Sequence, residues 1–340
     1  MTKRISKPRW NLPFKSIFRK MTGAAARAGS RALLKSLLTV PRVRKRIAAK
    51  LQQPAAPEWS SGVAIGFSGS LQYHLFSPKD MLRDEKLPLM IMLHGCGQNA
   101  LALAESSGMN RIAARKRFFV LYPEQNMLAN AQGCWNWFDT RSGRAQREVN
   151  LIGILIDQIC ASQQIDSGRI ALAGLSAGAS MAAFMAISHP ERFKAVAMHS
   201  GIGSGVAHSS ASAMMAMNGA NVNALALAVG AQLPALLVIQ GSADRIVAPA
   251  NGLVAAEQWA VQSGALAAPS RVVQRGARYP STITDYRVHG KIVVTFCEVT
   301  GLGHAWSGGG KNLAYSDPKG PHASGMIWAF AARQFALVSA

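Results

Sequence analysis

The stretch GLSAGAS, from Gly174 to Ser180, follows the apolar run RIALA and decides how the chain around it folds. Two glycines flank Ser176 at a spacing of two residues, and only small residues surround it. The apolar run predicts a short buried strand, and the segment ASMAAFMAISH predicts a helix. A serine between them occupies a sharp turn of strained backbone, where glycine avoids side-chain clashes. We therefore expect the Ser176 hydroxyl at a sheet edge, beside a helix N-terminus that favours negative charge.

The pattern of strands extends this prediction to residues 60–340. Near-continuous apolar runs, namely LPLMIML, FFVLYPEQ, FKAVAMHSG, PALLVIQG and KIVVTFCEV, alternate with segments of helical periodicity. Such runs are typical of a mostly parallel sheet with helices on both faces. Active sites in these sheets lie at the carboxyl ends of the strands. The residues that directly follow strands are therefore the candidates for catalysis.

Two such residues complete a catalytic set with Ser176. Asp244 follows PALLVIQG by a short turn, and His304 lies in the glycine-rich segment GLGHAWSGG after KIVVTFCEV. A carboxylate in this position can orient the histidine through its Nδ1–H, and the histidine then accepts the serine proton. The order serine, aspartate, histidine is that of α/β hydrolases. The sequence thus predicts an α/β-hydrolase fold with a triad of Ser176, Asp244 and His304.

Other acids and histidines remain as alternatives. Asp244 could instead satisfy local backbone N–H groups in its turn, in which case Asp285 or Glu298 would be the acid to test. The remaining histidines fit less well, because they lie at a helix end, in a hairpin-like turn and in a prolyl segment: His189, His289 and His322.

An oxyanion hole is expected from two backbone N–H groups. One belongs to Ala177, the residue after the nucleophile, and the other to Cys96 in the loop LHGCGQN that follows LPLMIML. Cys96 would contribute its amide rather than its thiol, and His94 would organise the loop. Such donors stabilise the charge that develops on the carbonyl oxygen.

The four cysteines predict neither a disulfide framework nor a metal site. Cys160 and Cys297 lie in an apolar helix and an apolar strand and read as core thiols. Cys96 and Cys134 lie in motif loops and could pair in an exported protein, but we expect them to be reduced. No cysteine has metal-ligand spacing with a histidine cluster, so we expect no metal, and the triad chemistry needs no cofactor.

The charge of the chain is concentrated at its start. The net charge is +21, yet residues 1–51 hold 15 of the 37 Lys and Arg and none of the 16 Asp and Glu. Two apolar stripes at helical spacing accompany this charge: Phe14, Ile17, Phe18 and Met21, then Leu33, Leu34, Leu37 and Leu38. Basic amphipathic segments of this kind favour an anionic surface such as a lipid monolayer. The alternative is a solvated arm, and the leucine-rich faces fit nucleic acid less well.

The rest of the N-terminal segment sets the domain boundary and the expected location. Residues 52–59 read as a linker to a catalytic domain at 60–340. No secretory pattern is found, and no run approaches the roughly 18–20 apolar residues of a membrane span. We therefore expect a cytoplasmic protein, associated with storage granules through residues 1–51. The alternative is an extracellular protein.

The motifs together resemble the polyhydroxybutyrate depolymerase family of esterases. The resemblance rests on LHGCGQN, VLYPEQ, CWNWF, GLSAGAS, GSAD, GLGHAWSGG and DPKGPHAS and runs from about residue 60 to the end. It implies an α/β-hydrolase fold and a Ser-His-Asp triad at Ser176, His304 and Asp244. It also includes relatives that act on feruloyl or acetyl-xylan esters. Secreted depolymerases of the family carry a signal peptide and a polymer-binding domain, and we recognise neither here.

Aromatic residues and one Met-rich segment are the candidate substrate contacts. The aromatic residues near the motif loops, Trp135, Trp137 and Trp306, are candidates for an acyl-binding wall, with core packing as the alternative. The Met-rich segment 205–230 is expected to form an insertion beside the site, and the sequence leaves open whether it is a lid.

The expected activity is that of a serine carboxylesterase. We expect hydrolysis of short-chain polyhydroxyalkanoate polyester or its oligomers through an acyl-serine intermediate. One alternative is a carboxylesterase for soluble feruloyl- or acetyl-type esters. An alternative of another class is a granule- or surface-binding protein with a vestigial hydrolase site.

Overall fold

The computed structural model of the chain describes residues 58–220 and 232–338. The predicted basic tail at 1–51, nearly all of the predicted linker and residues 221–230 of the predicted insertion lie outside the described residues. Within the described ranges, no helix has the length and apolar character needed to cross a membrane.

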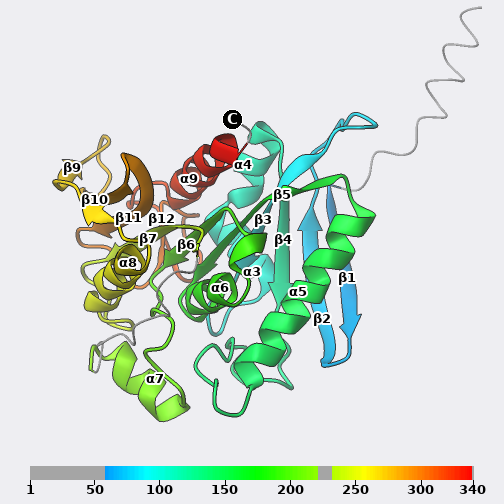
Figure 1. Cartoon of the computed structure of the whole chain (residues 1–340), viewed down its shortest axis with the longest axis horizontal. Helices are drawn as coiled ribbons and strands as arrows, with labels where there is room; N and C mark the ends of the chain where they lie inside the picture. Colours follow the sequence, from blue (N-terminus) through cyan, green and yellow to red (C-terminus); the bar gives the residue numbers. More distant parts are fainter. Residues whose placement is uncertain (1–57, 221–231, 339–340) are drawn as a thin grey trace, which may run out of the picture. The chain divides into compact units, whose positions relative to one another are not determined.

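One large sheet dominates the described residues (Figure 1). Its strand order is β1-β2-β4-β3-β5-β6-β7-β11-β10-β8, and β9 pairs with β10. The strands are β1 (Trp59–Gly66), β2 (Gly69–Phe76), β3 (Leu87–Leu93), β4 (Phe119–Glu124), β5 (Ile165–Leu175), β6 (Ala195–His199), β7 (Ala235–Gly241), β8 (Leu266–Ala267), β9 (Arg271–Val273), β10 (Ser281–Val288) and β11 (Lys291–Val299). The predicted apolar runs all lie in its central strands. Those strands, from β4 to β11, pair in parallel, whereas β2 and β10 flank them in antiparallel pairing.

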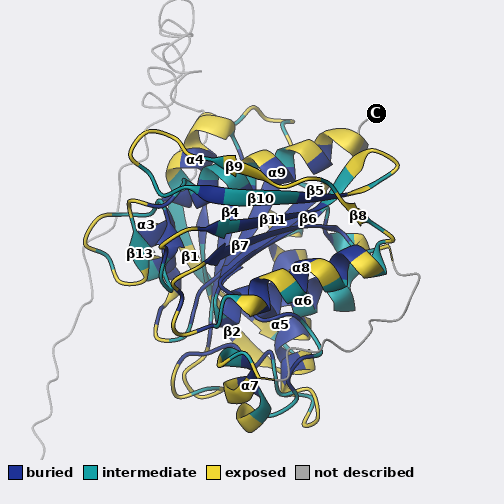
Figure 2. Cartoon of the chain, turned by 90° about the vertical axis from the view of Figure 1, so that its left-hand side faces the viewer, coloured by how far each residue is buried: buried dark blue, intermediate teal, exposed yellow. Residues whose placement is uncertain are grey.

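Helices cover both faces of this sheet, as Figures 1 and 2 show. One face packs against α5 (Arg144–Ser162), α6 (Ala177–Ser188) and α8 (Ala250–Gln262). The other face packs against α3 (Ala100–Ser107), α4 (Met109–Lys116) and α9 (Ala323–Val338). The helix α7 (Ser210–Met217), the short 3-10 helix η1 (Pro190–Arg192), and the two-residue strands β12 (Trp306–Ser307) and β13 (Ser316–Asp317) complete the described elements. The central strands are buried because each face of the sheet has its own apolar layer.

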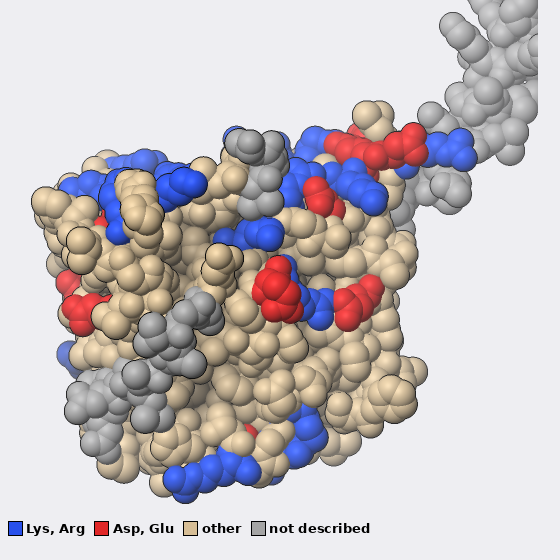
Figure 3. Space-filling model, viewed as in Figure 1, with Lys and Arg blue, Asp and Glu red and all other residues tan. Residues whose placement is uncertain are grey.

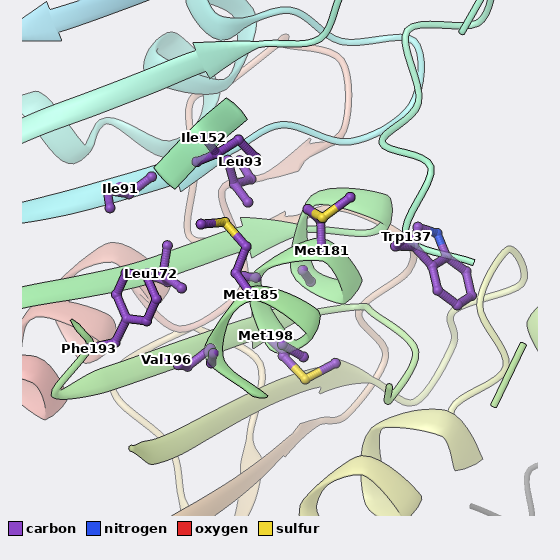
Figure 4. Packing of buried hydrophobic residues seen from close by; sticks show 14 of the residues in the cluster. Ile91, Leu93, Trp137, Ile152, Leu172, Met181, Met185, Phe193, Val196 and Met198 are labelled. Atoms are coloured by element: carbon purple, nitrogen blue, oxygen red, sulfur yellow. The ribbon is translucent and has the colours of Figure 1, made fainter. Parts of the chain in front are cut away.

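The helix α6 lies close to the sheet because small residues fill much of it. Nine of its twelve residues are buried, and seven of those nine are alanine, glycine or serine. Its larger side chains, Met181 and Met185, reach into the layer formed by Leu93, Leu172 and Met198 (Figure 4). This close packing fixes the N-terminus of α6 at the carboxyl edge of the central strands.

Candidate active site

Ser176 occupies the turn between β5 and α6 in a strained conformation. Its φ and ψ angles are 56° and −121°, a region that side chains rarely adopt. Its backbone N–H donates to the carbonyl oxygen of His199 at 2.9 Å, which ties the turn to the end of β6. Strain at one residue persists only where its surroundings hold it, and such residues cluster at functional sites.

The two flanking glycines permit this turn because backbone passes directly against them. A Cβ atom at Gly174 would lie 2.3 Å from the carbonyl carbon of Gly178. A Cβ atom at Gly178 would lie 2.1 Å from the carbonyl oxygen of Leu93, at the end of β3. No side chain fits at these distances, so both positions require glycine for close approach of the helix to the sheet.

Asp244 and His304 form a buried hydrogen-bonded pair at the same edge of the sheet. Asp244 follows β7, His304 follows β11, and these two strands pair in parallel. The Nδ1 atom of His304 lies 2.8 Å from Oδ2 of Asp244. A carboxylate oxygen accepts, so in the neutral ring Nδ1 carries the proton and Nε2 has the lone pair.

The surroundings of Asp244 keep its carboxylate ionised. Its Oδ1 accepts the backbone N–H groups of Ile246 and Val247, both at 2.9 Å, and Gln240 Nε2 donates to Oδ2 at 3.2 Å. Burial by itself would raise the pKa of Asp244, but the hydrogen bond and charge interaction with His304 and the two N–H donors hold that pKa below its usual value. The backbone contacts that suggested a simple turn aspartate therefore coexist with the contact to His304.

The alternative acids and histidines lie elsewhere. Asp285 is on β10, where it pairs with Arg271 and accepts the Thr295 hydroxyl at 2.8 Å. His189 caps the C-terminus of α6, and His289 occupies the turn between β10 and β11. Within the described residues, none of these three side chains hydrogen-bonds to His304 or Asp244.

The loop after β3 lies directly beside Ser176. A Cβ atom at Gly95 would be 3.4 Å from both the Cβ of Ser176 and the carbonyl oxygen of Leu175, so Gly95 lies next to the nucleophile turn. His94 braces this loop: its Nε2 accepts the Gln125 N–H at 3.1 Å, and its Nδ1 lies 2.9 Å from the Gly95 carbonyl oxygen. Ala177 is the first residue of α6, where backbone N–H groups have no partner within the helix.

The expectation of reduced thiols at Cys96 and Cys134 is wrong. The two residues form a disulfide, with Cα atoms 4.3 Å apart. They meet because β3 and β4 pair in parallel and the loops after these strands run side by side, joined also by the Gly97 N–H donating to Gln132. No local pattern around either cysteine indicates that the two loops lie side by side, because this follows from the pairing of the strands before them. The bridge ties the loop that carries Cys96 to the loop that carries Cys134.

Two of the three tryptophan candidates do not offer a free ring surface. Trp135 and Trp306 are both 0% exposed. Trp135 packs its ring against His94 at 5.5 Å, and Trp306 stacks on His199 at 5.2 Å and donates to Ser324. Both rings are thus packed in the interior, which favours the core-packing alternative for these two residues. Trp137 is also buried, at 8% exposed, beside Phe138 (Figure 4).

Two residues at the site were missed by the sequence argument. His199 ends β6, next to the elbow strand, and its Nε2 accepts the Ser307 N–H at 3.0 Å. Tyr315 packs edge-on to the His304 ring, with ring centroids 6.4 Å apart, and is 39% exposed. A histidine at the carboxyl end of a parallel strand is a signal that could have found His199. No comparable signal exists for Tyr315, which lies in an irregular loop.

The sheet, its helices and the turn at Ser176 define an α/β hydrolase. Among solved structures, an acetyl xylan esterase from Aspergillus awamori shares this fold, with a TM-score of 0.57 and 19% identity over 72% of this chain and 94% of that chain. Fungal esterases from Rhizomucor miehei align with a TM-score of 0.52 and 15% identity over 90% of this chain and 92% of that chain.

The chain belongs to the esterase PHB depolymerase family, whose sequence profile matches residues 71–295. Poly(3-hydroxyalkanoate) depolymerase C of Paucimonas lemoignei is 33% identical over 247 residues, which cover 69% of this chain and 58% of that protein. Acetylxylan esterase A of Talaromyces purpureogenus is 25% identical over 238 residues, which cover 64% of this chain and 59% of that protein. The chain thus spans less than two thirds of the length of these two curated relatives.

Proposed function

We propose that this protein is a serine carboxylesterase that hydrolyses short-chain polyhydroxyalkanoate polyester or its oligomers. The observation that carries the proposal is the position of Ser176, strained at the N-terminus of α6 and in contact with the Gly95 loop. Membership of the esterase PHB depolymerase family and the identity to a poly(3-hydroxyalkanoate) depolymerase support the substrate class.

In the proposed mechanism, Ser176 is the nucleophile and His304 the general base. Ser176 Oγ forms a bond to the ester carbonyl carbon while Nε2 of His304 takes its proton, and Asp244 holds the resulting imidazolium. The C–O bond to the alcohol then breaks, and His304 returns the proton to the departing oxygen. Water, deprotonated by His304, attacks the acyl-serine and releases the acid and free Ser176.

The oxyanion of each tetrahedral intermediate is stabilised by two backbone N–H groups. We assign these to Ala177 and Cys96, because the first belongs to a helix N-terminus and the second to the loop in contact with Ser176. Among the described residues, no acceptor takes the Cys96 N–H. Loss of one such donor costs about 3–4 kcal/mol of transition-state stabilisation in a comparable enzyme.

Substrate comparison tests the proposed function. Purified protein is given amorphous polyhydroxybutyrate granules, crystalline polymer, soluble hydroxybutyrate oligomers, and acetyl and feruloyl esters, and released acid is measured for each. The proposal expects the highest kcat/KM on the hydroxyalkanoate substrates. A clear preference for acetyl or feruloyl esters would favour the second candidate, a carboxylesterase for soluble esters, which the identity to acetylxylan esterase A supports.

The disulfide bears on where the protein works. A bond between Cys96 and Cys134 is stable in oxidising compartments and rare in the cytosol. It supports the extracellular alternative over a cytoplasmic one. Counting free thiols in protein taken directly from cell and culture fractions tests this: two unreactive cysteines in the exported fraction support it, whereas four reactive thiols in an active cytoplasmic protein contradict it.

Attachment to a granule or anionic lipid surface is proposed for residues 1–51. On the face drawn in Figure 3 the surface is largely uncharged, with basic side chains along its upper and lower edges. Residues 1–51 hold 15 Lys and Arg and no Asp or Glu, which makes them the candidates for an electrostatic anchor. Deleting them should leave soluble-ester hydrolysis unchanged and weaken binding to anionic vesicles, in a salt-dependent way. Equal vesicle binding by both proteins would contradict the anchor.

A further inference from the structure

His199 joins the nucleophile turn to the loop that carries His304. Its carbonyl oxygen accepts the Ser176 N–H at 2.9 Å, and its ring nitrogen Nε2 accepts the Ser307 N–H at 3.0 Å. Ser307 lies three residues beyond His304, and 108 residues separate it from His199 in the chain. One residue at the end of β6 therefore contacts both halves of the proposed catalytic machinery, through its backbone on one side and its ring on the other.

The hydrogen bonds of the ring fix its protonation. A backbone N–H can only donate, so Nε2 must hold a lone pair and the proton of neutral His199 must sit on Nδ1. Nδ1 lies 3.1 Å from the Ser200 hydroxyl, which can accept it. The ring is completely buried and stacks on Trp306, which directly precedes Ser307 in the chain, at an interplanar angle of 24°.

The neighbourhood of the ring favours this neutral form. Burial lowers the pKa of His199 to about 3, and repulsion from His304 acts in the same direction, against a smaller attraction to Asp244. A protonated His199 would lose its acceptor for the Ser307 N–H. It would also place a second positive charge near His304 at the step in which His304 becomes an imidazolium.

We propose that His199 is a positioning residue for the esterase reaction. As a neutral ring whose Nε2 accepts the Ser307 N–H, it fixes the loop that carries His304 relative to Ser176. The inference rests on the proposed function, because it presumes that Ser176 and His304 react together. His199 itself does not touch the reacting atoms. Its contribution is that one buried residue holds both segments: its carbonyl oxygen accepts the Ser176 N–H, and its ring accepts the Ser307 N–H of the loop that carries His304.

Kinetics of two substitutions test the proposal. His199→Leu removes the acceptor and leaves the Ser307 N–H unpaired, so kcat on a soluble aryl ester should fall by about 10- to 100-fold with KM little changed. His199→Gln offers Oε1 as an acceptor and should recover most of the lost kcat. This rescue is specific to the hydrogen bond, because both variants disturb the packing of the buried site.

A matched control separates positioning from loss of stability. Trp259 on α8 is a buried ring that donates one hydrogen bond to a backbone carbonyl, that of Pro234 at 2.8 Å, at the opposite end of β7. Trp259→Phe should lower stability to urea and keep the kcat of the parent. If all three variants lose kcat in proportion to their lost stability, or if His199→Leu keeps the parental kcat, the positioning role is wrong.

A second measurement needs no variant in the catalytic loop. In nitrogen-15 NMR of the parent with labelled histidine, His199 should stay neutral with its proton on Nδ1 between pH 8 and pH 5. A resonance for His199 that titrates in this range, or that carries its proton on Nε2, would overturn the proposal. Full activity of Ser176→Ala would instead overturn the proposed function, so the two failures are distinguishable.

Discussion

Oδ2 of Asp244 lies 2.8 Å from Nδ1 of His304, although 60 residues separate them in the chain. Both residues follow strands that are direct neighbours in the sheet, so the pairing of β7 with β11 brings them together. The carboxylate is held from its other side by two backbone N–H groups, which orient it before any substrate binds. The histidine ring is thus fixed in one tautomer by contacts that do not involve the serine.

Asp244→Asn should reduce kcat by about 10⁴-fold, because the amide no longer fixes the His304 tautomer that accepts the serine proton. Initial rates on a soluble aryl ester measure the effect. Asp285→Asn is the matched control: Asp285 is an equally buried carboxylate, in a network with Arg271 and Thr295. That control should lose stability and keep its turnover. A parental rate for Asp244→Asn would show that another residue is the acid.

Stability should depend on pH through His199. Its pKa is about 3 in the fold against 6.5 for an ordinary histidine, because burial and the proximity of His304 oppose its charge, while Asp244 only partly offsets them. Between these two values the unfolded chain binds a proton that the folded chain does not. The contribution to the free energy of unfolding is therefore full above pH 6.5 and is lost as pH falls, by up to about 1.4 kcal/mol per pH unit.

Urea unfolding from pH 7 to pH 4 measures this dependence. His199→Gln lacks the titrating group and should lose less stability over that range than the parent. Titrating groups far from His199 affect both proteins alike, so the difference between the two curves reports His199 and its coupling to His304 and Asp244. Parallel curves would contradict the assignment of a buried neutral histidine.

Reduction of the disulfide should weaken both stability and turnover. The bridge joins residues 38 apart, and its loss should lower the free energy of unfolding by about 2–4 kcal/mol. It should also lower kcat, because the Cys96 N–H is aimed by a loop that the bridge holds. Activity and urea unfolding of the double variant Cys96→Ser/Cys134→Ser measure both effects.

Cys160→Ser is the control for this experiment. Cys160 is a free cysteine on α5, partly buried and outside the bridge. Its removal should change neither quantity appreciably. Unchanged kcat in the double variant would mean that the Cys96 loop keeps its position without the bridge.

The sequence was informative wherever a local pattern determines the structure. The glycines around Ser176 are required because a Cβ atom at either position would lie within 2.3 Å of backbone atoms, and that requirement is visible as a two-residue spacing. The apolar runs identified the central strands because both faces of the sheet are covered. The parallel sheet then implied that residues after different strands share one edge, where Asp244 and His304 are found in contact.

The disulfide, the burial of the tryptophans and the contacts of His199 depend on which distant segments pack together. No local sequence pattern indicates that packing. The disulfide forms because β3 and β4 are neighbours. We expected reduced thiols because no secretory pattern is recognised in the sequence. Trp135 and Trp306 lie near the motif loops, but their exposure is decided by the loops that fold over them. The role of His199 rests on a contact to Ser307, 108 residues away, so its position at a strand end was only half of the signal.

Covalent labelling of Ser176 tests the central claim most directly. The parent and Ser176→Ala are treated with a fluorophosphonate ester, and the modified peptide is identified by mass spectrometry alongside initial rates on a soluble ester. The account predicts stoichiometric modification of Ser176 in the parent, none in the variant, and a loss of kcat on the order of 10⁶-fold. Modification at another residue, or a Ser176→Ala variant that hydrolyses the ester at the parental rate, would contradict it.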